Sequence, residues 1–217
     1  MKIALIGATG FVGSAILNEA LNRGHRVTAI LRHPERLTVK NNNLSVVQGD
    51  VMDTNSLAEI VKGSDVVISA YNAGWSNPDI YNEFLKGSQS IQQGVKKSGV
   101  KRLIVMGGAG SLFVAPGVQL VDTPQFPADW KAGASAARDY LNILKKEDQL
   151  DWTFISPAIE MHQGTSGERK GRYRTGLDNP VVDANNKSII SVEDVAVAAV
   201  DEAEHPKHIR QRFTVAY

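Results

Sequence analysis

The 217-residue sequence contains no cysteine, which excludes a disulfide scaffold, a thiolate nucleophile and a cysteine-bound zinc. It has almost no net charge either, since 24 lysines and arginines oppose 23 aspartates and glutamates. We therefore expect neither nucleic acid nor a membrane surface as a partner. No apolar run approaches the ~20 residues of a membrane span. The apolar start Met1–Ile6 is too short for a signal-peptide core. These absences predict a cytoplasmic protein.

Repeats and linkers are also missing, which favours one domain over residues 1–217. Short runs rich in Val and Ile alternate with longer amphipathic stretches. This pattern predicts a doubly wound, Rossmann-type α/β fold with a parallel sheet covered on both faces by helices. The predicted strands are Ile3–Ile6, Arg26–Leu31, Leu44–Gln48, Val66–Ser69, Arg102–Met106, Trp152–Ser156 and Arg212–Val215. The predicted helices are Phe11–Asn22, Asn55–Lys62, Ile80–Ser98, Ala128–Lys146 and one ending near Glu202.

The pattern loosens after Pro157, and residues 157–187 are rich in Gly, Lys, Arg, Asn and Asp. We expect this segment to be a small, loop-rich C-terminal cap at the carboxyl edge of the sheet. Its basic stretch Glu168–Arg174 is expected to be a solvated loop, the alternative being a surface that attracts an anionic substrate. Regular structure returns at Ser191–Asp194, which fits a capping box opening the last helix.

A glycine-rich turn follows the first predicted strand. In such a turn one glycine allows the tight bend, the next lets the backbone approach a pyrophosphate, and the third lets the helix pack on the strand. The helix start adds free N–H groups and a partial positive charge. A glycine triplet is a weak signal alone, but here it opens a full βαβ pattern. We predict a dinucleotide site formed by Gly7, Thr9, Gly10, Phe11, Val12 and Gly13.

The residue after the second strand favours NADP(H) over NAD(H). An NAD site usually has an acidic residue there, whereas this sequence has Arg32, with Arg36 one turn further on. A guanidinium can pair with a 2′-phosphate through two hydrogen bonds. The alternative is a pair of solvated arginines, which leaves NAD(H) open. Asp50 and Val51 follow the third strand and are expected at the adenine, unless Asp50 is a loop or capping residue.

These motifs resemble those of the atypical short-chain dehydrogenases/reductases. The resemblance rests on Gly7–Gly13, Arg32, Ile68–Asn72, Gly107–Leu112 and Ser191–Ala196. The sequence is most similar to the compact NAD(P)H-flavin reductase-like and NmrA-like group, which includes biliverdin-IXβ reductase/flavin reductase. Length and motif order match over nearly the whole chain. The resemblance implies a hydride-transfer site where the fourth and fifth strands end.

The resemblance also implies which residues lie beside the cofactor, in addition to the glycine turn. They are Ala70, Tyr71, Asn72, Gly107, Gly108, Ala109, Pro157 and Ala158. Each has a simpler alternative. Glycines that end a strand are common in turns, and a proline there can merely stop the strand.

The sequence departs from the superfamily in one important respect. Typical members carry a catalytic Tyr followed four residues later by Lys, but here Pro127 stands at the tyrosine position and only Lys131 remains. The one tyrosine on this helix, Tyr140, is followed at that spacing by Leu144. Ser111 and Lys131 are the remaining catalytic candidates. Their alternatives are a turn-capping serine and a solvated lysine.

Flavin reduction does not need the missing tyrosine, because water can supply the proton and the protein supplies binding and orientation. The leading hypothesis is therefore an NADPH-dependent oxidoreductase that transfers hydride to a planar acceptor such as a flavin. Alternatives are a non-catalytic NADP(H)-binding redox sensor and, less favoured, a sugar epimerase or dehydratase. Four aromatic residues could stack on the acceptor or simply pack: Tyr71, Trp75, Phe113 and Trp130. We expect no metal, and a monomer or homodimer.

Overall fold

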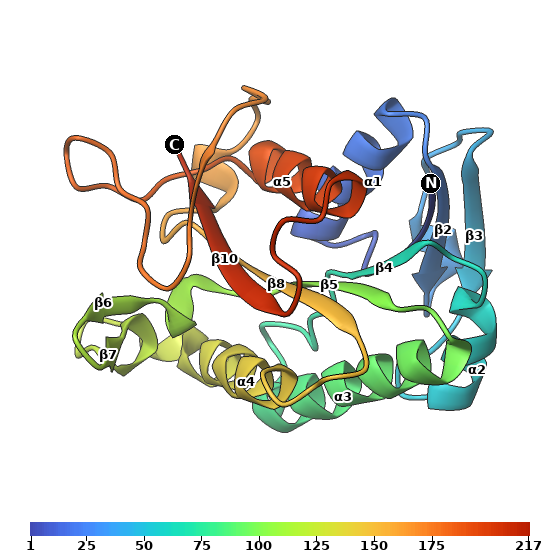
Figure 1. Ribbon diagram of the computed structural model, residues 1–217, viewed down its shortest axis with the longest axis horizontal. Helices are drawn as coiled ribbons and strands as arrows, with labels where there is room; N and C mark the ends of the chain where they lie inside the picture. The colour runs from blue at the N-terminus through green and yellow to red at the C-terminus, as the bar shows by residue number, and fades with distance from the viewer.

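One eight-stranded sheet runs through the computed structural model, which describes residues 1–217 (Figure 1). Its strand order is β3-β2-β1-β4-β5-β8-β10-β9, and every neighbouring pair is parallel except β10 with β9. The predicted doubly wound parallel sheet is confirmed, with one antiparallel strand added at an edge. The strands are β1 (Lys2–Ile6), β2 (Arg26–Leu31), β3 (Leu44–Gln48), β4 (Val66–Ser69), β5 (Arg102–Met106), β8 (Asp151–Pro157), β9 (Arg174–Gly176) and β10 (Gln211–Ala216).

Five helices cover both faces of this sheet (Figure 1). Helices α1 (Phe11–Asn22) and α5 (Val192–Glu204) pack together on one face. The other face carries α2 (Thr54–Val61), α3 (Ile80–Ser98) and α4 (Ala128–Leu144). Successive residues of a strand enter opposite cores: Ile3 and Leu5 pack with α1 and α5, and Ala4 and Ile6 pack on the other side. Double coverage explains why the strands show no polar alternation.

The winding direction reverses between β1 and β4. From β1 the chain proceeds outward to β2 and β3, and from β4 it proceeds the other way through β5, β8 and β10. Ile6 and Ser69 are register partners at the ends of β1 and β4. The N–H of Ala70 donates to the Ile6 carbonyl oxygen at 3.0 Å. Ligands of open α/β sheets bind beyond the carboxyl ends of the strands at such a switch point.

The predicted cap, residues 157–187, is fastened to the body of the molecule. It holds a 3₁₀ turn, η4 (Gln163–Thr165), and the edge strand β9. The Arg169 guanidinium bonds the Glu19 carboxylate of α1 at 2.8 Å through two nitrogens. The N–H groups of Lys170 and Gly171 donate to the Asp194 carboxylate of α5 at 3.0 and 2.7 Å. Residues 169–176 therefore pack against α1 and α5 and add an antiparallel strand at the carboxyl end of β10.

The start of α5 corrects one expectation. The Ser191 hydroxyl accepts the Asp194 N–H at 3.2 Å, as a helix cap should. The Asp194 carboxylate does not complete a capping box, because it is occupied by the cap segment and by the hydroxyl of Tyr217 at 2.6 Å. Asp194 is fully buried, so these bonds replace its hydration.

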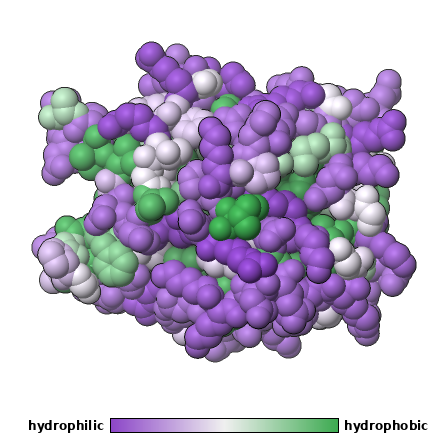
Figure 2. Space-filling model, in the orientation of Figure 1, coloured by the Kyte–Doolittle hydropathy of each residue, from purple (hydrophilic) through white to green (hydrophobic).

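A hairpin of β6 (Phe113–Ala115) and β7 (Val118–Gln119) was, like β9, absent from the sequence prediction. The visible surface is mostly hydrophilic, with apolar patches at the end that carries this hairpin and the loop after β9 and others elsewhere on the face, one of them near its middle (Figure 2). Val114, Val118, Leu177 and Val182 are among the exposed large hydrophobic residues. None of the helices is both long enough and apolar enough to cross a membrane.

Candidate functional site

The glycine turn leaves no room for side chains. Gly7 has φ +84°, and a Cβ on it would lie 2.4 Å from the Ala70 carbonyl oxygen. A Cβ on Gly13 would lie 2.0 Å from the Gly7 carbonyl oxygen. At Gly10 the nearest atom to such a Cβ is the Gly7 oxygen at 3.3 Å. The first strand, the fourth strand and α1 therefore meet backbone to backbone at the switch point.

The start of α1 offers unpaired N–H groups beside this turn. Its N-cap is Gly10, which provides no side-chain cap, and its first turn contains no acidic residue. The first intrahelical bond is donated by Ser14 to the Gly10 carbonyl oxygen at 2.9 Å. The N–H groups of Phe11, Val12 and Gly13 have no protein acceptor. Free N–H groups and the positive end of a helix dipole bind anions, so the turn fits a pyrophosphate.

Arg32 stands exposed at the end of β2 without a carboxylate partner. Its carbonyl oxygen accepts a hydrogen bond from the Gln48 side-chain amide at 3.3 Å, which fixes the backbone there. Arg36 is also exposed, at the end of η1 (Pro34–Arg36). The nearby Glu35 pairs with His33 at 3.2 Å and leaves both arginines free. The two guanidinium groups are thus available to an anionic ligand, as a 2′-phosphate requires.

The two aspartates after β3 have different roles. Asp53 is the N-cap of α2, and its carboxylate accepts the N–H groups of Asn55 and Ser56 at 3.1 and 3.0 Å. Asp50 is exposed and takes the Met52 N–H on one oxygen at 2.9 Å. Because Asp53 does the capping, Asp50 keeps its other oxygen for a ligand. The adjacent Val51 side chain is buried.

Tyr71 forms a wall of the same region. Its ring fills the space beside Gly87 of α3, where a Cβ would lie 2.5 Å from a ring carbon. It stacks on Phe84 at a centroid distance of 5.9 Å, and its hydroxyl donates to the Glu83 carbonyl oxygen at 3.2 Å. Burial raises the pKa of Tyr71, and the charge of Arg32 acts against that rise. Tyr71 and Arg32, which are 39 positions apart, therefore face one region.

The other residues implied beside the cofactor differ in burial and in the space around them. A Cβ on Gly107 would lie 2.0 Å from the Phe154 ring, so this glycine is required by core packing. At Gly108 a Cβ would meet no atom within 4 Å. Ala109 is half-buried and begins η2 (Ala109–Ser111). Pro157 and Ala158 are buried, so they offer a ligand little beyond their backbone. Asn72 is exposed, and its side-chain oxygen accepts the Gly74 N–H at 2.7 Å.

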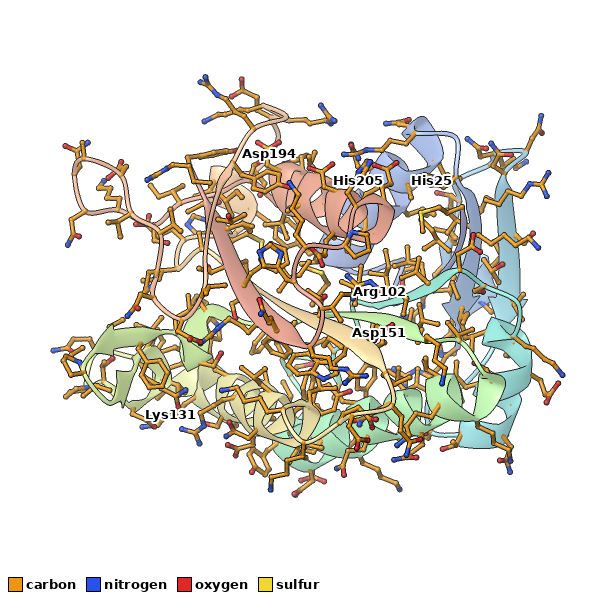
Figure 3. The ribbon with its side chains drawn as sticks, in the orientation of Figure 1. His25, Arg102, Lys131, Asp151, Asp194 and His205 are labelled. Atoms are coloured by element: carbon orange, nitrogen blue, oxygen red, sulfur yellow. The ribbon has the colours of Figure 1, made fainter.

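Neither catalytic candidate is presented to this turn. Ser111 is 2% exposed, and its hydroxyl accepts a bond from the Arg212 guanidinium at 3.2 Å. Arg212 is in turn paired with the Asp178 carboxylate. Lys131 is exposed on the first turn of α4, on the side away from the sheet (Figure 3). The alternatives, a structural serine and a solvated lysine, are the interpretations that the geometry supports, and we assign neither residue to catalysis.

Tyr140 cannot replace the missing tyrosine. Its side chain is 1% exposed, and its hydroxyl has no hydrogen-bond partner. Burial raises the pKa of this hydroxyl far above its usual range. The group faces the core between α3 and α4, next to Phe84. It can neither reach nor protonate a substrate at the glycine turn.

Other charged groups are engaged in structural pairs. Glu202 accepts bonds from Arg102 at 2.7 Å and His208 at 2.8 Å, and Glu204 accepts from His25 at 2.8 Å. Arg102 lies in the interior between β5 and α5 (Figure 3). No group of three His, Cys, Asp or Glu side chains in residues 1–217 is arranged to hold a metal ion.

The sequence did not reveal two long-range interactions, one at the turn after β5 and one between the cap segment and α1. Arg212 reaches Ser111 across 101 positions, and Arg169 reaches Glu19 across 150. One indication of the first was present in the sequence, because Arg212 is a charged residue at the start of a buried strand and a buried charge needs a partner. Nothing in the sequence pointed from Arg169 to Glu19.

Comparisons with known proteins agree with this geometry. A family model described as NAD(P)H-binding matches residues 7–206. The "Uncharacterized protein YwnB" of Bacillus subtilis is 41% identical and covers 99% of this chain and 98% of its own length. A "putative epimerase" from Bacteroides thetaiotaomicron has a TM-score of 0.91 at 51% identity, covering 100% and 96% of the two chains. A "putative NADH-flavin reductase" from Streptococcus pneumoniae has a TM-score of 0.86 at 35% identity, covering 100% and 99%.

Proposed function

Because the chain belongs to the NAD(P)H-binding family of atypical short-chain dehydrogenases/reductases, we propose that it is an NADPH-dependent reductase of a planar acceptor such as a flavin. One observation carries the proposal: the superfamily's tyrosine acid is missing, since Pro127 stands at its position and Tyr140 is buried in the core. The hydroxyl of Tyr71, the tyrosine beside the turn, is engaged by the Glu83 carbonyl oxygen. Reduction of a carbonyl carbon develops an alkoxide that needs a positioned proton donor. A flavin can take its proton from water, so the site lacks nothing that this reaction requires.

The residues around the turn would hold the cofactor in distinct ways. The free N–H groups of Phe11, Val12 and Gly13 would bind the pyrophosphate. Arg32 would pair with the 2′-phosphate, and Asp50 would face the adenosine. Gly108 leaves open space where the nicotinamide ribose would lie. When bound, NADPH supplies a hydride from its nicotinamide ring.

Orientation would be this protein's main contribution to the rate. The backbone of the turn is held in one conformation, because Gly7 and Gly13 pack directly against the backbone carbonyl groups of Ala70 and Gly7. Tyr71 is locked between Gly87 and Phe84. A preformed site of this kind holds a donor and an acceptor in reactive geometry without paying the ordering entropy during the reaction.

Among the relatives, the similarity to the Streptococcus pneumoniae protein supports flavin as the acceptor, and its name specifies NADH. The Bacteroides thetaiotaomicron protein bears the name of an epimerase. Epimerisation needs acid and base groups at a sugar carbon, and neither Ser111 nor Lys131 is placed to act as one. We therefore favour reduction.

A non-catalytic redox sensor is the second candidate. The same observation favours it, namely that both catalytic candidates are turned away from the turn. The two functions separate in one assay: NADPH oxidation with FMN, riboflavin or a quinone, followed by the loss of reduced-nicotinamide absorbance. We expect saturable turnover with a flavin. Tight NADPH binding without turnover on any of the three acceptors would instead support the sensor.

A further inference from the structure

We propose that Trp75 and Trp130 form the stacking site for the planar acceptor, an inference that rests on the reductase function proposed above. Both side chains are unusually open for tryptophan, with 60% and 55% of their surface exposed. The third tryptophan, Trp152, is 2% exposed in the core. Large aromatic side chains are normally buried, so two exposed ones near the same helix end need a reason.

Trp130 lies in line with the buried stripe of α4, at its N-terminal end. The stripe continues at a three- and four-residue spacing through the buried residues Gly133, Ala137, Tyr140 and Leu144. Because α4 connects two parallel strands, β5 and β8, its N-terminal end lies at the carboxyl edge of the sheet. Helix side chains also lean toward the N-terminus. Trp130 is thus an exposed side chain in the first turn of α4, at the carboxyl edge of the sheet.

Trp75 approaches the same helix from the loop between β4 and α3. Two atoms of its six-membered ring lie 2.8 and 3.4 Å from where a Cβ on Gly133 would be. Because Gly133 has no side chain, the indole of Trp75 can pack against α4 at this position, beside Ile80 of α3. The loop is ordered by Asn77, whose side-chain amide donates to the Ala73 carbonyl oxygen at 3.3 Å and to Glu83 at 2.8 Å. One side of Trp75 rests on α4, and much of the remainder is exposed.

The turn after β5 packs against the same part of α4. A Cβ on Gly110 would lie 3.1 Å from the Ala134 Cβ. Residues of a helix follow one another at 100° of rotation about its axis. Viewed down α4, Trp130 therefore lies between Gly133, which contacts Trp75, and Ala134, which contacts the turn after β5. The unfilled space at Gly108 belongs to the same turn. Trp75, Trp130 and the expected nicotinamide position therefore surround one region.

This arrangement suits a flat heteroaromatic ring. Two indoles supply wide, rigid apolar faces for offset stacking. The ring of Tyr71 packs on Gly87 and Phe84, and Phe113 is half-buried on β6, so Trp75 and Trp130 are the more exposed of the four predicted stacking residues. The acceptor class that follows is an isoalloxazine or a ring system of similar size.

Tryptophan fluorescence tests this assignment without any turnover. Riboflavin is titrated into protein saturated with oxidised NADP⁺, with free N-acetyltryptophanamide as the correction for light absorbed by the flavin. We expect saturable quenching in the natural protein. In the double variant W75F/W130F only buried Trp152 remains, and its emission should lose most of that quenching. An emission maximum at shorter wavelength than that of the natural protein, as a buried indole gives, shows that the double variant is folded.

Steady-state kinetics provide the second readout. W75A and W130A should each raise KM for riboflavin about 5- to 10-fold, with NADPH affinity unchanged. The matched control is V46A, which removes an exposed hydrophobic side chain from β3 and should leave KM unchanged. Equal KM values in W75A, W130A and the natural protein would overturn the tryptophan site while leaving flavin reduction standing. Tryptophan-dependent quenching without any NADPH oxidation would support the site and overturn the reductase function.

Discussion

The carbonyl oxygen of Gly7 occupies the place where a side chain on Gly13 would begin, 2.0 Å from the position of its Cβ. The contact fixes how closely α1 approaches the end of β1. It also sets the direction in which the free N–H groups of α1 point. The contact between Gly7 and Gly13, which are six positions apart, is thus the closest packing constraint at the site.

Gly13→Ala should disturb both folding and cofactor binding, because the backbone must move to admit the methyl group. We expect a loss of about 1–3 kcal/mol in the free energy of unfolding and a fall of about tenfold or more in NADPH affinity. Gly108→Ala is the matched contrast, since its Cβ meets no protein atom within 4 Å. It should keep its stability within about 0.5 kcal/mol and lose only NADPH affinity. Urea unfolding and calorimetric titration measure both; natural affinity in G13A would contradict the pyrophosphate assignment.

Arg32→Asp should weaken NADPH much more than NADH. The exposed guanidinium has no protein partner, and a charge-assisted bond to a 2′-phosphate is worth about 1.5–3 kcal/mol, or about 10- to 100-fold in affinity. Arg26→Asp is the control, since Arg26 is also exposed but stands at the opposite end of the same strand. Calorimetry with both dinucleotides gives the answer. An equal loss for the two would mean that Arg32 does not contact the 2′ position.

Tyr140→Phe should leave turnover unchanged and stabilise the fold. The hydroxyl is buried without a partner, and removing an unsatisfied polar group returns about 1 kcal/mol. Thermal unfolding and the NADPH–flavin assay test this together. A large drop in kcat with intact stability would show that the reaction uses this tyrosine after all.

Glu19→Gln should change how stability depends on pH. Bonds from Arg169, and then from Arg23, hold the pKa of this carboxyl below its usual value of 4.5, against the effect of burial. A carboxyl whose pKa is lowered by folding contributes stability above its unfolded pKa and loses it as the pH falls through the folded pKa. The advantage of the natural protein over E19Q should therefore be full above about pH 5 and should shrink below 4.5.

Urea unfolding over a pH series measures that difference directly. Glu59→Gln is a suitable control, because Glu59 is an exposed residue of α2 without an ion pair. A Glu19→Gln difference that stayed constant from about pH 7 to pH 3 would mean that the ion pairs with Arg169 and Arg23 contribute nothing.

The amino-acid sequence by itself determined the parallel sheet, its helices and the glycine turn. These depend on short-range rules: the run of buried residues in a doubly covered strand, the period of a helix, and the steric freedom of Gly7 and Gly13. Element ends moved by one or two residues, because capping and fraying depend on neighbours. The missing tyrosine was equally visible, since Pro127 stands in its place.

Only the tertiary structure decided which side chains face the site. Lys131 points to solvent, whereas its neighbour Trp130 lies in line with the buried stripe of α4, because packing fixes the rotation of α4 about its axis. The Ser111 hydroxyl accepts a hydrogen bond from Arg212, which is 101 positions away. Glu19 and Asp194 hold the cap segment on α1 and α5. Such contacts join distant segments whose meeting depends on how the whole sheet and its helices pack, and no local pattern encodes that arrangement.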